Sequence, residues 1–151
     1  MKGIGIFVSL LLIGGGIAMY VTTRPPDRSL DAGGQAWVDG FTTWRADMAL
    51  AVDRAEVEIG VTRGEKLSAR LIEPLRDCTA SLAQVGEPPT LLEDVLEDAG
   101  AACGEVEYAL SLNETFGSPA LASTRQHLHR AGRWLTAAEF SLRRELDTGS
   151  P

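Results

Sequence analysis

The clearest periodicity in this chain lies in the segment WVDGFTTWRADMALAVDRA, residues 37–55. Six apolar residues recur there at intervals of four, three, four, three and four: Trp37, Phe41, Trp44, Met48, Ala51 and Ala55. These intervals place all six on one face of an α-helix, whereas Asp39 and Asp53 fall away from it. We therefore predict an amphipathic helix that buries this face against other helices.

Three further segments show the same kind of periodicity. After Gly64, one face carries Leu67, Leu71, Leu75, Cys78, Leu82 and Val85. A third face carries Leu92, Val95, Ala99, Cys103, Val106 and Leu110. A fourth carries Leu121, Leu128, Ala131, Leu135, Ala138 and Leu142. Four amphipathic segments with short loops predict an all-α, up-down four-helix bundle over residues 35–146, followed by a disordered tail at 147–151.

The boundaries of these helices are predicted from local signals. Because proline lacks an amide hydrogen, Pro74 predicts either a kink in the second helical region or a helix that starts at Glu73. Thr90 and Glu93 have the spacing of a capping box at the start of the third helix. Ser118, which is followed by proline, is the predicted N-cap of the fourth helix.

The N-terminal segment is long and apolar enough to cross a membrane. The 19 residues from Gly3 to Val21 include no charged side chain, and a helix of that length measures roughly 28 Å, close to the hydrocarbon thickness of a bilayer. We predict that residues 1–21 form a transmembrane signal-anchor that contacts the lipid bilayer through residues 3–21. The prolines and glycines that follow predict an extended stalk at 22–34.

The alternative for this segment is a cleaved signal peptide. Lys2 supplies a minimal charged region, and Gly16 to Ala18 offer small residues of the kind found at cleavage sites. Apolar character continues through Tyr20, which suits the membrane interface and favours the uncleaved anchor. Cleavage would instead release a secreted helical ligand or inhibitor.

Cys78 and Cys103, the two cysteines of the chain, lie on the apolar faces of consecutive predicted helices. We predict a disulfide between them, although counting residues from the intervening turn leaves an offset of about 7 Å along the helix axis. Two buried free cysteines are the alternative. Because the charges that flank residues 3–21 are nearly balanced, we place the bundle outside the cytoplasmic membrane mainly on the apolar N-terminus and this cysteine pair. A bundle on the cytoplasmic side of the membrane is the alternative.

The sequence contains no catalytic or metal-binding motif. It lacks a nucleophile elbow, a phosphate loop and a zinc-protease motif. His127 and His129 point about 200° apart on a helix, so they cannot bind one metal ion together. A net charge of −7 argues against nucleic acid as a partner. We expect no cofactor and no enzymatic activity, and a hydrolase or metal enzyme built from dispersed carboxylates is the least favoured class.

Charge is distributed unevenly between the last two predicted helices. Residues 91–115 hold seven acidic residues and no lysine or arginine, whereas the fourth helix holds five arginines. We interpret this as complementarity between neighbouring helices, with a partner surface as the alternative. Phe140 is predicted to point away from the core, next to arginines. The candidate partner surface consists of Arg130, Arg133, Trp134, Phe140 and Arg144. The alternative is that the register of the fourth helix is shifted, or that another segment of the chain covers this side of the helix.

These features together predict a membrane-anchored, extracytoplasmic helical protein that acts as a non-enzymatic binding or assembly module. The excess of twelve arginines over two lysines is typical of a high-GC bacterial genome, which suggests a bacterial envelope, on the periplasmic or cell-wall side of the cytoplasmic membrane. A protein partner of unknown identity is expected.

Overall fold

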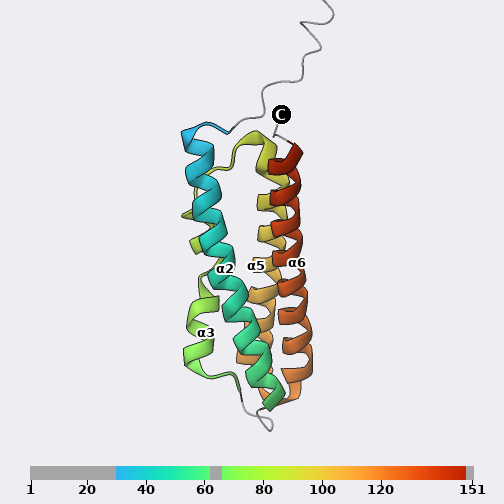
Figure 1. The fold of residues 1–151 in the computed structure, drawn as a ribbon. Coiled ribbons are helices and arrows are strands. Elements are labelled where there is room, and N and C mark those ends of the chain that lie inside the picture. The colour runs from blue at the N-terminus through green and yellow to red at the C-terminus, as the bar shows by residue number, and fades with distance from the viewer. Residues whose placement is uncertain (1–29, 62–65, 149–151) are drawn as a thin grey trace, which may run out of the picture.

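The computed structural model describes residues 30–61 and 66–148, and within these ranges every regular element is helical. The elements are α2 (Ala32–Val61), α3 (Ala69–Arg76), α4 (Cys78–Ala83), the 3-10 turn η1 (Thr90–Leu92), α5 (Glu93–Phe116), the 3-10 turn η2 (Ser118–Ala120) and α6 (Leu121–Thr148). Figure 1 shows α2, α5 and α6 as three long columns, with α3 and α4 forming a shorter fourth. Successive columns run in opposite directions, so the predicted all-helical up-down bundle is confirmed.

The predicted transmembrane segment, residues 1–21, lies outside the described residues. Across the part of the chain that the structure describes, none of the helices is both long and apolar enough to cross a bilayer. The predicted end of the stalk is wrong, because α2 already begins at Ala32. Asp31 Oδ1 accepts a hydrogen bond from the Gly34 amide at 2.7 Å, which satisfies one of the free amides at this helix start. Gly34 itself is buried, and a Cβ there would lie 3.2 Å from Pro89 Cγ.

The core forms where the predicted apolar faces meet. All six residues of the α2 face are buried, and Phe41 has no exposed surface. Its ring lies 5.0 Å from that of Trp37 and 5.7 Å from that of Trp44, measured between centroids. The indole nitrogen of Trp44 donates to Ser81 Oγ at 2.9 Å, and that of Trp37 donates to a backbone carbonyl. These polar contacts attach α2 to α4 and to the turn after it without leaving buried donors unpaired.

The second helical region is divided into two short helices. Its first helix begins at Ala69 and contains Pro74, so the predicted start at Glu73 is wrong. The interruption lies at Asp77, three residues after the proline, and α4 continues from Cys78. The two pieces contain 8 and 6 residues, whereas α2 contains 30. They therefore cover only part of α2, and two residues of the predicted face, Leu71 and Val85, are half-buried.

The predicted start signals of the last two helices are also corrected. Thr90 lies in a 3-10 turn, and α5 begins at Glu93 without a side-chain cap, so the capping box does not form. This turn is closed instead by backbone atoms, because the Leu92 amide donates to the Pro89 carbonyl at 2.7 Å. Ser118 begins the 3-10 turn η2, and α6 begins three residues later at Leu121. At the other end, α6 extends to Thr148 and includes two residues of the predicted tail.

Candidate functional site

The predicted disulfide is present and closes the α4–α5 hairpin. Cys78 and Cys103 are bonded, their Cα atoms are 5.4 Å apart, and both side chains are buried. Cys78 and Cys103 lie at unequal numbers of residues from the turn between α4 and α5. This difference is taken up because residues 86–89 are not helical, and an extended residue spans about twice the length of a helical one. The bond lies inside the core, so its role is structural.

The surface predicted on α6 consists of outward-facing side chains. Leu128, Leu135 and Leu142 are buried, which confirms the register on which the prediction of an outward Phe140 depends. Phe140 is 67% exposed and Trp134 is 40% exposed. Arg130, Arg133 and Arg144 are exposed along the same side of the helix. We call Arg130, Arg133, Trp134, Phe140 and Arg144 the α6 outer face.

Two arginines of the α6 outer face have no acidic partner. Arg144 contacts Glu145 at 3.0 Å. In contrast, no carboxylate of the described ranges lies within 4.0 Å of Arg130 or Arg133. Together with Glu105, Trp134 and Ala137 they line a hollow of about 400 Å³, in which the Glu105 carboxylate is engaged by His127. The hollow therefore combines an indole ring with two guanidinium groups that are available to a ligand or partner.

The contacts between α5 and α6 are polar at two positions and do not include an arginine–carboxylate ion pair among the described residues. The two helices share the most extensive helix interface of the described bundle. Their polar cross-contacts, however, join Glu105 to His127 at 2.5 Å and Asp98 to Ser141 at 3.0 Å. None of the described ion pairs links an α6 arginine to an α5 carboxylate. The α6 arginines are exposed, and the predicted complementarity of the charges on these neighbouring helices stays a prediction.

The two histidines make ordinary packing contacts. His127 is half-buried against α5, and its ring meets that of Tyr108 edge-on at a centroid distance of 4.5 Å. His129 points to the other side of α6, where its ring nitrogen lies 3.6 Å from Glu56. Across residues 30–61 and 66–148, no group of three histidine, cysteine or acidic side chains is placed to hold a metal ion.

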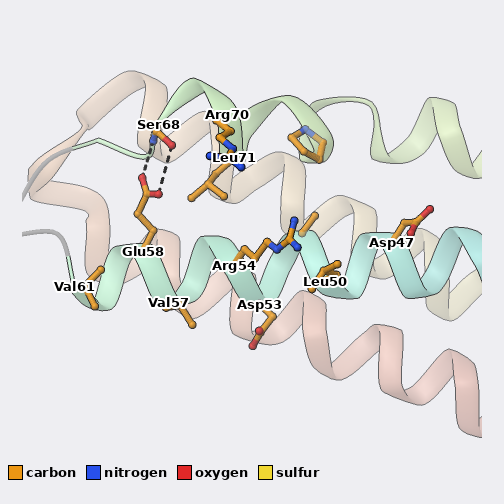
Figure 2. Close-up of a pocket in the computed structure, with 12 residues that line it drawn as sticks. Asp47, Leu50, Asp53, Arg54, Val57, Glu58, Val61, Ser68, Arg70 and Leu71 are labelled. Carbon is orange, nitrogen blue, oxygen red and sulfur yellow. Dashed lines mark hydrogen bonds between the residues drawn. The ribbon is translucent and has the colours of Figure 1, made fainter.

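A second surface feature, which sequence reasoning missed, is a groove between α2 and α3. It has a volume of about 760 Å³, and Figure 2 shows the side chains that line it. We define the α2–α3 groove by these residues: Asp47, Leu50, Ala51, Asp53, Arg54, Val57, Glu58, Val61, Ser68, Arg70, Leu71 and Pro74. Its apolar lining is unusually open, because Leu50, Val57 and Val61 are 48%, 59% and 73% exposed.

The signal for this groove is present in the sequence as a second apolar stripe. Leu50, Val57 and Val61 recur at intervals of seven and four residues, away from the buried face of α2. On its own, this spacing does not distinguish a stripe covered by another helix from one left open. The stripe is open here because α3 is short and covers only one side of it.

No protein-family model matches the chain, and no curated protein or solved structure is detectably similar to it. Its two open surfaces are therefore the basis for a functional proposal.

Proposed function

We propose that this protein is a membrane-anchored, non-enzymatic binding or assembly module of a bacterial envelope, whose α6 outer face contacts a protein partner. The observation that carries the proposal is the exposure of Phe140 and Trp134 next to two arginines that form no ion pair with the described carboxylates. Aromatic rings and arginines supply much of the binding energy at protein interfaces. A cationic face on a chain of net charge −7 favours a partner with an acidic surface.

The proposed topology places the bundle outside the cytoplasmic membrane. Residues 3–21 would span the bilayer as an uncleaved signal-anchor, and the proline-rich residues after them would hold the bundle at a short distance. The Cys78–Cys103 disulfide supports an oxidising compartment. Figure 1 shows the start of α2 and the end of α6 at the same end of the bundle. An N-terminal anchor would therefore attach at that end and leave the α6 outer face, along the side, accessible.

Site-specific photo-cross-linking in cells tests the α6 outer face. A photoreactive amino acid replaces Phe140 in one variant and Phe116, which is 60% exposed at the end of α5, in a matched control. We expect a discrete protein adduct from position 140 that is lost when Arg130 and Arg133 are both changed to glutamate. An adduct of equal yield from position 116, or one that the charge reversal leaves unchanged, would contradict the proposal.

The alternative function is a secreted helical ligand or inhibitor released by cleavage. It differs from the proposed topology in one measurable property, the N-terminus of the mature chain. Recovery of peptides from residues 3–21 in washed membranes supports the anchor, whereas a mature N-terminus after Ala18 and release into the medium support the alternative.

A further inference from the structure

The α2–α3 groove is continuous with the α6 outer face. A further hollow of about 370 Å³ lies between α2 and α6, and it is lined by Asp53, Glu56, His129, Gly132, Arg133 and Thr136. Arg133 also lines the hollow beside Trp134, and Asp53 also lines the α2–α3 groove. The three depressions therefore meet at these two side chains. We call the combined surface of the three depressions the belt.

The belt crosses the bundle at one level instead of running along a helix. Contacts between neighbouring helices show which residues are level: Glu105 of α5 meets His127 of α6, and His129 of α6 meets Glu56 of α2. Glu58, one half-turn further along α2, accepts two hydrogen bonds from the residue before α3. The belt thus passes over the α5–α6, α6–α2 and α2–α3 boundaries in turn. A straight helix cannot follow this curved path, whereas an extended chain can wrap around it.

The belt carries unpaired charges whose sign changes along it. Arg130 and Arg133 lie at its α5–α6 end, and Asp53 follows in the middle. Arg54 and Arg70 lie at its α2–α3 end. Among the described residues, none of these four guanidinium groups has a carboxylate within 4.0 Å, and Asp53 has no basic nitrogen within that distance. Figure 2 shows Arg54 directed toward α3 and Asp53 directed to the other side of α2. The order cation, anion, cation favours an occupant with the order acid, base, acid.

Apolar side chains lie next to the arginines of the groove. Leu50 and Val57 line it and are 48% and 59% exposed. Glu58 closes one end of the groove through hydrogen bonds to the Ser68 amide at 3.0 Å and hydroxyl at 3.4 Å, drawn as dashed lines in Figure 2. Asp47 lies toward the other end, away from the two arginines. The middle of the groove therefore suits an apolar side chain beside an acidic one.

We infer that the partner proposed for the α6 outer face binds this protein through one extended segment that follows the belt into the α2–α3 groove. The inference rests on the proposed function and adds the chemistry of the segment. An acidic residue lies at Arg130 and Arg133, a basic residue lies at Asp53, and an apolar residue with a second acidic residue lies in the groove.

The length of this segment follows from the spacing of the helices. Neighbouring helix axes in a bundle are about 8–10 Å apart, and the belt crosses two such steps around a convex surface. At roughly 3.3 Å per extended residue, the segment contains on the order of ten residues. All of its contacts with the belt should therefore map to one short stretch of the partner.

Photo-cross-linking at a second position of the full chain in cells tests the inference. The photoreactive amino acid replaces Leu50 in the groove, Phe140 on the α6 outer face, or Phe116 as the control outside the belt. Each adduct is digested, and the linked residue of the partner is identified by mass spectrometry. We expect positions 50 and 140 to link to the same protein, at residues within one stretch of about ten.

A matched pair of charge reversals on α3 tests the role of the groove. Arg70 and Arg76 are both exposed, but Arg76 lies on the other side of α3, in a hollow shared with α5. We expect Arg70→Glu to lower the adduct yields at positions 50 and 140 by about fivefold. Arg76→Glu should leave both yields unchanged. Circular dichroism and thermal unfolding accompany each variant, and because both side chains are exposed we expect both variants to remain folded.

Failure of the inference can be distinguished from failure of the proposed function. An adduct from position 140 without one from position 50, or with a different protein at each, overturns the inference and leaves the proposed function in place. Linked residues in separate regions of the partner exclude a single extended segment. Equal effects of Arg70→Glu and Arg76→Glu exclude the groove from the binding site. No adduct from either position would contradict the proposed function and the inference together.

Discussion

The Cys78 and Cys103 side chains are bonded to each other inside the core, where one has no exposed surface and the other 1%. The bond joins α4, which contains 6 residues, to the long helix α5. A helix this short has little stability of its own, because the first turn is costly to form. The disulfide therefore fixes α4 against α5. The short helix α3, which precedes α4, lines the α2–α3 groove.

Removal of this disulfide should destabilise the bundle strongly. Closing a loop between residues 25 apart restricts the unfolded chain by an amount worth on the order of 3 kcal/mol. We expect the double variant Cys78→Ala/Cys103→Ala to lose about that much unfolding free energy in urea. Addition of reductant should produce the same loss in the unchanged protein and none in the variant. Equal stability of the two proteins without reductant would contradict this role.

Ser81→Ala should weaken the attachment of α4 to α2. The hydroxyl accepts the indole N–H of Trp44 at 2.9 Å, and Trp44 is 8% exposed. Without an acceptor, a largely buried donor costs about 1–3 kcal/mol. Urea unfolding measures the loss, and Ser111→Ala on the exposed side of α5 is the control. A Ser81→Ala variant as stable as the control would show that the indole finds another acceptor.

Thr124→Val should stabilise the protein. Thr124 is fully buried, and its hydroxyl has no hydrogen-bond partner among the described residues. Valine keeps the branched shape and removes the unpaired polar group, so we expect a gain of about 1 kcal/mol. Thermal unfolding provides the measurement. Thr136→Val is the comparison, because its exposed hydroxyl donates to the Gly132 carbonyl and its replacement should give no gain. A loss of stability in Thr124→Val would contradict the unpaired hydroxyl.

Much of the core could be predicted from the sequence because it depends on local periodicity. The six-residue face around Phe41 is buried as predicted, and the bonded cysteines lie on the faces assigned to them. The burial of Leu128 and Leu142 likewise leaves Phe140 in solvent. Each of these inferences requires only that residues three or four apart share a side of a helix.

Other features could not be predicted because they depend on contacts between residues that lie far apart in the sequence. Pro74 marks a weak point, but the packing of α3 and α4 decides that the chain breaks at Asp77. Thr90 carries a capping signal, yet backbone bonds close that turn. The α2–α3 groove depends on how much of α2 the neighbouring helices cover, which the apolar stripe at Leu50 and Val57 does not reveal.

The two lysines of the chain report whether the bundle is anchored and lies outside the cytoplasmic membrane. Lys2 precedes the proposed span, and Lys66 is exposed in the bundle. Intact cells are treated with a charged amine-reactive reagent that does not cross the cytoplasmic membrane, and peptides are mapped by mass spectrometry. We predict modification of Lys66 in intact cells and of Lys2 only after lysis. Protection of Lys66 until lysis would contradict it and would place the bundle and its partners in the cytoplasm.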